Sequence, residues 1–135
     1  EQYDQGSVQS YFQYYGKLAK QENMLQDEPR TSTYQRAIVQ NWKDFQGKRA
    51  LDLGAGSGIL SFFALQAGAE KVYAVEASSM AEVVQTLADA NEEFRDRIEV
   101  VNRPVETITT QVDGKVDVLV SEPIGTFLFN ERMIE

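Results

Sequence analysis

Two glutamates flank a short apolar loop near the end of the sequence. Glu122 directly follows a predicted strand, residues 116–121, and Glu131 lies nine residues further along; between them stand Ile124, Phe127, Leu128 and Phe129. A carboxylate accepts hydrogen bonds from a cationic planar group, and two carboxylates can hold such a group from both sides. The pattern predicts a site that handles a guanidinium, with Glu122 and Glu131 as its catalytic residues. The alternative is an ordinary carboxylate at a strand end and an acid in the first turn of a helix.

A glycine-rich segment stands where a predicted strand passes into a predicted helix. Its glycines are Gly54, Gly56 and Gly58, in the spacing G-x-G-x-G. Glycine lets the backbone approach a ligand closely, and the N-terminus of the helix can face a negative group. Ile59 stands where the dinucleotide fingerprint G-x-G-x-x-G requires its third glycine, which argues against NAD and FAD.

Glu76 ends the next predicted strand, about 20 residues beyond the glycines. An acidic side chain at this place can accept hydrogen bonds from both hydroxyls of a ribose. The combination favours an adenosine without a 2′-phosphate as the ligand. A glycine-rich structural turn beside an exposed carboxylate is the competing interpretation.

The sequence contains no histidine and no cysteine. Disulfides, thiolate metal sites and the commonest metal ligand are therefore excluded, and we expect no metal. Acid–base chemistry falls to carboxylates. No apolar run approaches the roughly 20 residues that a membrane-spanning helix needs, and no signal sequence opens the chain, so we expect a soluble, intracellular protein without a membrane partner.

The net charge of -8 is unevenly distributed. Residues 1–50 hold 7 basic and 6 acidic side chains, whereas residues 51–135 hold 6 basic and 15 acidic ones. An acidic surface repels the phosphates of nucleic acids and attracts cationic peptides. Basic protein segments are therefore the expected partners, and no direct nucleic-acid binding is expected.

Beyond Gly47 the pattern alternates between apolar strands and amphipathic helices. The predicted strands are 49–53, 71–76, 98–102 and 116–121, and the predicted helices are 57–67, 79–91 and one that starts near Phe129. Continuous apolar strands fit a sheet that is covered on both faces. The sequence therefore predicts an α/β fold with a doubly wound parallel sheet, in a domain of residues 47–135.

Residues 1–46 form the predicted N-terminal part, a helical lid and an edge helix. Two short helices are expected before Pro29, and a third from Thr31 or Ser32 to a point before Gly47, packed on the sheet's edge. Thr107 to Lys115 is expected to be a polar loop. Open sheets of this class commonly have more than four strands, so we expect the sequence to be part of a longer protein.

Several segments contain motifs of one enzyme family: residues 11–15 (Y-F-Q-Y-Y), 21–27 (Q-E-N-M-L-Q-D), 30–36, 52–58 (D-L-G-A-G-S-G), 75–77 (V-E-A) and 121–135. The last is the most specific, because it pairs S-E-P with a second glutamate in N-E-R-M. On these motifs the sequence resembles the protein arginine methyltransferases, in particular the coactivator-associated group of type I enzymes. The resemblance implies the Rossmann-like fold of S-adenosylmethionine-dependent methyltransferases, here without the family's C-terminal β-barrel.

The resemblance also implies a cofactor, S-adenosylmethionine, which leaves as S-adenosylhomocysteine. Glu76 would bind its ribose, Glu106 its adenine amino group and Arg30 its carboxylate, because a guanidinium can donate two parallel hydrogen bonds. The further cofactor-binding residues that it implies are Tyr11 and Phe12 as a lid, Gln21 and Met24 from the N-terminal helices, and Gly54 and Gly56 from the glycine-rich segment.

On the substrate side, the resemblance implies that Tyr15 lies beside the reacting groups. Asp27 would brace Arg30 or the substrate-binding wall. Glu122 and Glu131 would orient the substrate guanidinium, and Glu122 would receive the proton that is released after transfer.

The implied activity is methylation of arginine side chains in proteins such as histone tails and coactivators, giving asymmetric dimethylarginine. The resemblance further implies a homodimer for the full-length enzyme and a place in the nucleus and the cytoplasm. Two alternatives remain open. One is a non-catalytic cofactor-binding or interaction module, and the other, less favoured by the acidic charge, is a nucleic-acid adenine methyltransferase.

Overall fold

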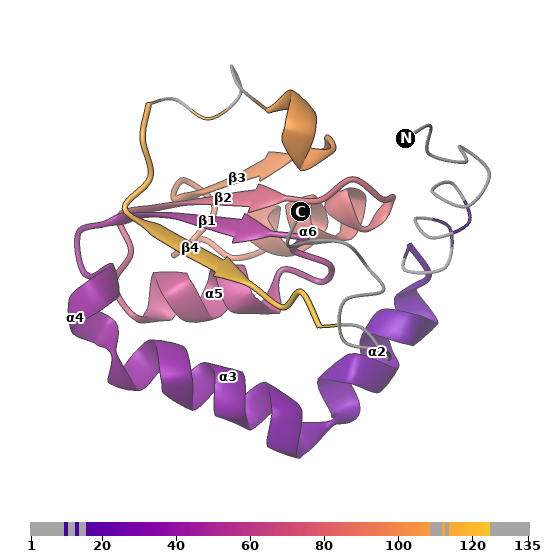
Figure 1. Ribbon diagram of the computed structural model, residues 1–135, viewed down its shortest axis with the longest axis horizontal. Coiled ribbons are helices and arrows are strands. Elements are labelled where there is room, and N and C mark those ends of the chain that lie inside the picture. Colours follow the sequence, from indigo (N-terminus) through magenta and orange to yellow (C-terminus); the bar gives the residue numbers. More distant parts are fainter. Residues whose placement is uncertain (1–9, 11–12, 14–15, 109–111, 113, 125–135) are drawn as a thin grey trace.

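The computed structural model describes residues 10, 13, 16–108, 112 and 114–124 of the chain (Figure 1). Its elements in chain order are α2 (Leu18–Gln26), α3 (Glu28–Gln40), α4 (Trp42–Phe45), β1 (Arg49–Leu53), α5 (Ile59–Gln66), β2 (Lys71–Val75), α6 (Met80–Asp89), β3 (Ile98–Val101), η1 (Val105–Thr107) and β4 (Val118–Ser121). Among the described residues, no helix has both the length and the apolar character required to cross a membrane.

The four described strands form one parallel sheet in the order β3-β2-β1-β4. The chain moves outward from β1 through β2 to β3 and then returns to place β4 on the other side of β1. The strand order therefore reverses between β1 and β4, which is where ligands bind in open α/β sheets.

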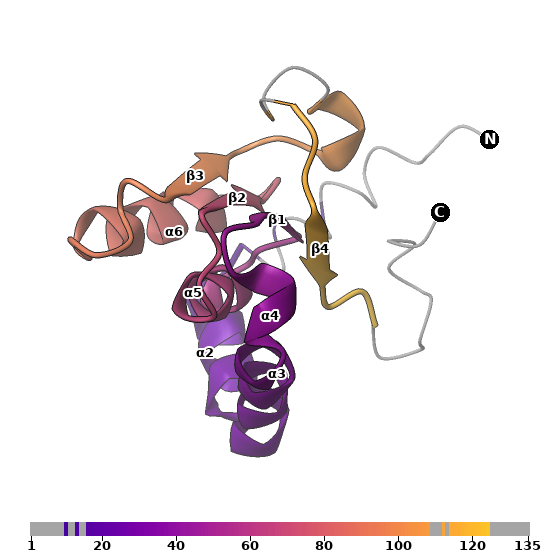
Figure 2. The ribbon, with the colours of Figure 1, turned by 90° about the vertical axis from the view of Figure 1, so that its left-hand side faces the viewer.

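Layers of different kinds cover the two faces of the sheet (Figure 2). Helices α5 and α6 cover one face, where Ala50, Val72 and Ala74 contribute to the larger apolar core. The 3-10 helix η1, which follows β3 along the chain, lies over the other face (Figure 2). The prediction of a doubly wound parallel sheet is confirmed.

Side-chain alternation along each strand explains why the strand sequences are apolar without interruption. Leu51, Tyr73, Val75 and Val101 point away from α5 and α6 and form a second apolar cluster. Successive strand residues face opposite sides, and both sides here are covered. Residues 107–115, predicted to be a polar loop, include part of this cover, because Ile108 and Val112 pack against the second cluster.

The start of α3 differs from the prediction. The helix begins at Glu28, with Pro29 in its first turn, and not at Thr31 or Ser32. Proline lacks only an N–H that the first turn of a helix leaves unpaired, so it fits there and does not stop the helix. Prediction of a helix end before Pro29 was correct, but the break is a single residue, Asp27.

The position of α3 also differs from the prediction. The helix packs against α5, below the sheet in Figure 1, and not on the sheet's edge. Ile38 of α3 and Phe45 of α4 are buried in the larger apolar core together with Ala64 of α5. The N-terminal helices thus form a further layer on the helical face, and α2 leads from this layer to the carboxyl ends of the strands.

Candidate functional site

The register of the sheet aligns the ends of all four described strands. Leu53 pairs with Val75 on one side and with Ser121 on the other, and Val75 pairs with Val101. Each next residue along the chain therefore emerges at the same edge; these residues are Gly54, Glu76, Asn102 and Glu122. The carboxyl edge of the sheet is thus lined by a glycine-rich loop, two carboxylates and an amide.

The glycine-rich loop between β1 and α5 folds tightly over the end of β2. The amides of Gly54 and Ala55 donate to the carbonyl of Val75 at 2.9 and 3.0 Å. Gly58, the N-cap of α5, has a φ of 81°, and a Cβ added there would lie 2.9 Å from Cγ1 of Val84. Glycine is required at this position because α6 packs directly against the loop.

Gln21 of α2 covers the loop at Gly56. A Cβ added to Gly56 would lie 2.7 Å from the Oε1 of Gln21, and Gly56 has a φ of 54°. Gln21 is the buried residue of α2, with 5% of its surface exposed. The structure thus brings a residue of the N-terminal helices to the glycine-rich loop.

Glu76 is buried, and its carboxylate holds two loops together. Oε2 accepts a hydrogen bond from the amide of Gly56 at 2.7 Å, and Oε1 accepts one from the amide of Ser78 at 2.8 Å. Each oxygen of a carboxylate has capacity for a further donor. Glu76 can therefore fix the glycine-rich loop and accept hydrogen bonds from a ligand at the same time.

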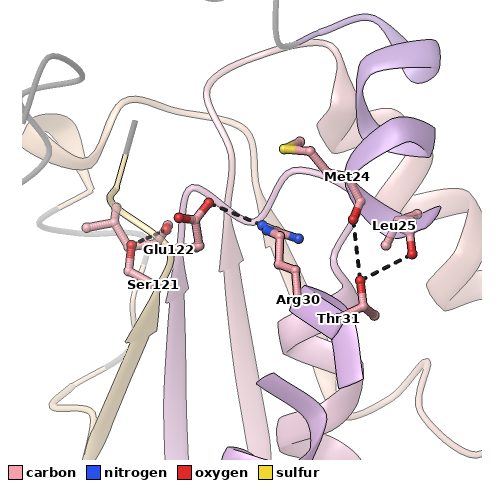
Figure 3. A network of polar contacts seen from close by, with 7 residues as sticks. Met24, Leu25, Arg30, Thr31, Ser121 and Glu122 are labelled. Atoms are coloured by element: carbon pink, nitrogen blue, oxygen red, sulfur yellow. Dashed lines mark hydrogen bonds and ion pairs between the residues drawn. The ribbon is translucent and has the colours of Figure 1, made fainter. Parts of the chain in front are cut away.

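Glu122, which follows β4, forms an ion pair with Arg30 of α3. The Nη2 of Arg30 lies 3.1 Å from the Oε2 of Glu122, and the two side chains are 28% and 26% exposed. Figure 3 shows the guanidinium of Arg30 reaching from the start of α3 toward the end of β4. The neighbouring Ser121 donates from its hydroxyl to the carbonyl of Leu53 at 2.9 Å, which joins the ends of β4 and β1.

A tight corner between α2 and α3 sets the position of Arg30. Asp27 caps α3, since its Oδ1 accepts from the amide of Arg30 at 3.2 Å. The hydroxyl of Thr31 donates to the carbonyls of Met24 and Leu25 at 3.4 and 3.2 Å, as Figure 3 shows. The cap and the hydroxyl bridge fix the last turn of α2 and the first turn of α3 relative to each other.

Tyr34 lies one turn beyond Arg30 on α3 and interacts with the same ion pair. The guanidinium carbon of Arg30 lies 5.4 Å from the centre of the Tyr34 ring. Burial and then the charge of Glu122 raise the pKa of the Tyr34 phenol, and the positive charge of Arg30 lowers it. Tyr34 therefore stays neutral and offers its ring face to a cation.

Asp52 is a buried acid on β1, two residues before the glycine-rich loop. Burial raises the pKa of its carboxyl to about 6, against the lowering effect of hydrogen bonds from Ser61. The hydroxyl of Ser61 donates to Oδ2 at 2.7 Å. Oδ1 is buried and, among the described residues, has no hydrogen-bond partner.

The structure brings some of the predicted site residues together. Gln21, Gly56 and Glu76 form one group, and Arg30 and Glu122 form another. Met24 is half-buried on α2, and its side chain extends toward the strand ends in Figure 3. Gly54 is the first residue of the glycine-rich loop.

Other predicted site residues are not brought into this arrangement. Glu106 is exposed in η1, and among the described residues no contact joins it to the two groups. Asp27 is exposed and acts as the cap of α3. Tyr11, Phe12, Tyr15 and Glu131 lie outside the described residues.

Three residues of the site were not predicted from the sequence: Tyr34, Asp52 and Asn102. Asp52 could have been noticed, because an acid inside an apolar strand at the edge of a glycine-rich loop is unusual. Tyr34 lies in a segment that was predicted only as a helix, and Asn102 was predicted as the last residue of a strand. In the described part of the chain, no group of three acidic side chains could hold a metal ion.

Comparison with protein families and curated proteins gives consistent results. Residues 12–130 match the family model described as ribosomal protein L11 methyltransferase (PrmA). A histone-arginine methyltransferase CARMER from Anopheles gambiae is 57% identical over 132 residues, which are 98% of this chain and 21% of that protein. The chain spans less than a quarter of the length of the curated relatives it matches.

Solved structures show the same similarity in three dimensions. Protein arginine methyltransferase 10 from Arabidopsis thaliana matches with a TM-score of 0.86 and 46% identity, over 91% of this chain and 34% of that one. The PRMT1 enzyme-prozyme complex of Trypanosoma brucei, solved with AdoHcy, matches with a TM-score of 0.81 and 39% identity, over 87% and 36%.

Proposed function

Because the chain matches a methyltransferase family model and belongs to the protein arginine methyltransferases, we propose that it binds S-adenosylmethionine and directs methyl transfer to arginine side chains of proteins. The observation that carries the proposal is the ion pair between Arg30 and Glu122 at the carboxyl edge of the sheet. It places a guanidinium against the carboxylate that is expected to receive the substrate guanidinium. Glu122 is thus within reach of such a group and half-buried.

Three features support S-adenosylmethionine as the cofactor. Glu76 presents a carboxylate beside the glycine-rich loop, as an acceptor for ribose hydroxyls must. Arg30 can exchange its partner Glu122 for the carboxylate of the cofactor. The buried Oδ1 of Asp52, which has no hydrogen-bond partner in the described part of the chain, suits a cationic donor such as the ammonium group of the cofactor. The Trypanosoma brucei relative was solved with the product, AdoHcy.

When bound, S-adenosylmethionine supplies an electrophilic methyl group on a sulfonium. Glu122 would accept hydrogen bonds from the substrate guanidinium and concentrate its positive charge on the nitrogens that do not react. The attacking nitrogen, whose lone pair is otherwise delocalised, then becomes the better nucleophile. Glu122 would also take up the proton released after transfer. We propose that Glu131 holds the substrate guanidinium from the other side and that Tyr15 lies beside it, as expected from the sequence.

The finer parts of the proposal concern the whole protein. The names of the relatives support histone tails as substrates, and the net charge of -8 suits such cationic segments. We further propose coactivators as substrates, asymmetric dimethylarginine as the product, a homodimer as the assembly, and action in the nucleus and the cytoplasm. These parts rest on the resemblance of the motifs.

Replacement of Glu122 by glutamine in the whole protein tests the proposal. We expect transfer of labelled methyl groups to a histone-tail peptide to fall by about 100-fold or more, because glutamine cannot accept a proton. Binding of S-adenosylhomocysteine should not weaken. Unchanged transfer would overturn the proposed role of Glu122, and no transfer by the unaltered whole protein would favour the non-catalytic alternative. Transfer to DNA in place of the peptide would favour an adenine methyltransferase.

A further inference from the structure

The side chain of Asn102 bridges two carbonyl groups of the turn that follows β2. Its Nδ2 donates to the carbonyl of Glu76 at 2.8 Å and to the carbonyl of Ser78 at 2.9 Å. A side-chain amide nitrogen has two hydrogens, so this bridge uses both. Asn102 lies directly after β3 and is otherwise exposed.

The bridged turn is the one that carries the Glu76 carboxylate. The main chain of Glu76 is already tied to β3, because its amide donates to the carbonyl of Val101 at 3.0 Å. Asn102, directly after that strand, adds two hydrogen bonds, to the carbonyls on either side of Ala77. The backbone of Glu76 is thus held from β3, while its carboxylate is held by the amides of Gly56 and Ser78.

Loss of the Asn102 bridge should change the position of Glu76 more than the stability of the fold. Removal of the exposed Asn102 side chain leaves no cavity and should open a path for water to the carbonyls of Glu76 and Ser78, two residues that are otherwise buried, so the fold should lose little. The direction of the Glu76 carboxylate should depend on the bridge more strongly than the stability of the fold does. Even a small displacement of a binding group costs affinity. A loss of ligand affinity that exceeds the loss of stability would therefore be the signature of a positioning role.

We propose that Asn102 is a positioning residue for cofactor binding, which fixes the turn after β2 so that Glu76 meets the ribose hydroxyls of an adenosyl ligand. The inference rests on the proposed function, because it assigns the ribose to Glu76. Asn102 acts through Glu76 and need not touch the ligand. An aspartate at this position would have the same shape without the two N–H donors and would fail to form the bridge.

Titration of S-adenosylhomocysteine into the full chain, followed by calorimetry, tests the inference. Asn102→Ala should weaken binding about tenfold, the equivalent of one or two lost hydrogen bonds, with little change in the melting temperature. Asn102→Asp should weaken binding at least as much and should also lower the melting temperature, because its carboxylate would face the two carbonyl oxygens. Asn41→Ala is the matched control. The Nδ2 of Asn41 also donates to a carbonyl, that of Ala37 at 2.7 Å, but at the end of α3, on the opposite side of the molecule from the carboxyl ends of the strands (Figure 1). The Asn41→Ala variant should bind S-adenosylhomocysteine normally.

A second titration shows whether Asn102 acts through Glu76. An analogue of S-adenosylhomocysteine that lacks both ribose hydroxyls cannot bond to Glu76, so Asn102→Ala should weaken its binding hardly at all. Equal losses for both ligands, or normal binding by Asn102→Ala, would overturn the inference while the proposed function stands. Failure of the unaltered chain to bind S-adenosylhomocysteine would overturn both. Because the two ligands are compared on the same variant, this test requires no additional variant that must fold.

Discussion

Arg30 and Glu122 are 92 positions apart in the sequence, and their side chains are paired at 3.1 Å. Each is assigned a ligand group of opposite charge, the cofactor carboxylate for Arg30 and the substrate guanidinium for Glu122. In the structure, each side chain therefore stands where we propose that the ligand of the other binds. Binding of the cofactor carboxylate to Arg30 would therefore release Glu122 for the substrate, which couples the two binding steps through one ion pair.

Replacement of Glu122 by glutamine should strengthen binding of S-adenosylhomocysteine. The change removes the charge that competes for Arg30, and a half-exposed ion pair of this kind contributes little, so we expect an affinity increase of about twofold to fivefold. Calorimetric titration at low and high salt would measure it, and the difference should shrink at high salt.

A second ion pair provides the control for this measurement. Glu99 of β3 lies 2.6 Å from Lys71, and both side chains are partly exposed. Glu99→Gln removes the same charge elsewhere on the sheet and should leave the affinity unchanged. Weaker binding in Glu122→Gln would show that Glu122 holds Arg30 ready for the cofactor and does not compete with it.

Alanine at Gly56 should destabilise the fold by more than backbone strain alone. The φ of 54° costs an L-residue about 1–2 kcal/mol. The added Cβ would also meet the buried Gln21 at 2.7 Å. The atoms it meets are the end of a flexible side chain that can move, so chemical denaturation should show an additional loss of up to about 1 kcal/mol from overpacking.

The variant Gly47→Ala separates the cost of backbone strain from the cost of the contact with Gln21. Its φ of 67° is similar, and nothing lies within 4 Å of an added Cβ, so Gly47→Ala measures strain without a clash. The excess at Gly56 should disappear in a background of Gln21→Ala. If it persisted there, the contact between α2 and the glycine-rich loop would not be its cause.

Much of the fold follows from local patterns. The four strands and the helices α5 and α6 were predicted within three residues of their bounds, because apolar runs and glycines mark them directly. The loop at Gly54 and the acid at Glu76 follow two such strands, so the edge of the site was predictable too. Pro29 misled the prediction of α3, since proline is compatible both with the end of a helix and with its first turn.

The contacts within the site could not be predicted, because they join distant segments. Nothing near Arg30 in the sequence indicates Glu122 as its partner, and Asn102 is 26 residues from Glu76. Asp27 was expected near Arg30, and in the structure it is the N-cap of α3 and accepts from the amide of Arg30. A helix that started at Thr31, as predicted, would not have had Asp27 as its N-cap. The assigned roles of these residues toward ligands remain predictions.

Loss of the Glu76 carboxylate should affect both ligand binding and the fold. Glu76→Ala leaves the amides of Gly56 and Ser78 without their acceptors, which should cost about 1–3 kcal/mol of stability. S-adenosylhomocysteine should bind about 100-fold more weakly, since bonds to a charged acceptor are strong. Calorimetry together with denaturation would separate the two effects. Glu82→Ala, which removes an exposed acid in the first turn of α6, is the control and should change neither by much.

The buried carboxyl of Asp52 should make stability depend on pH in the acid range. Its pKa is raised from 3.8 to about 6, chiefly by burial, so the folded protein holds this proton more tightly than the unfolded chain does. Its contribution is therefore fully present below about pH 4 and is lost as the pH rises through 6. A shift of about two units corresponds to about 3 kcal/mol.

The variant Asp52→Asn isolates this contribution from that of the other acids. The difference in unfolding free energy between the unaltered protein and the variant should fall by up to about 3 kcal/mol between pH 4 and pH 6. Ser61→Ala should move the fall to higher pH, because the bond from Ser61 lowers the pKa of Asp52. Urea denaturation at several pH values would measure both. A difference that stays constant with pH would show that Asp52 titrates in the folded protein as it does in the unfolded chain, against the effect that its burial should have.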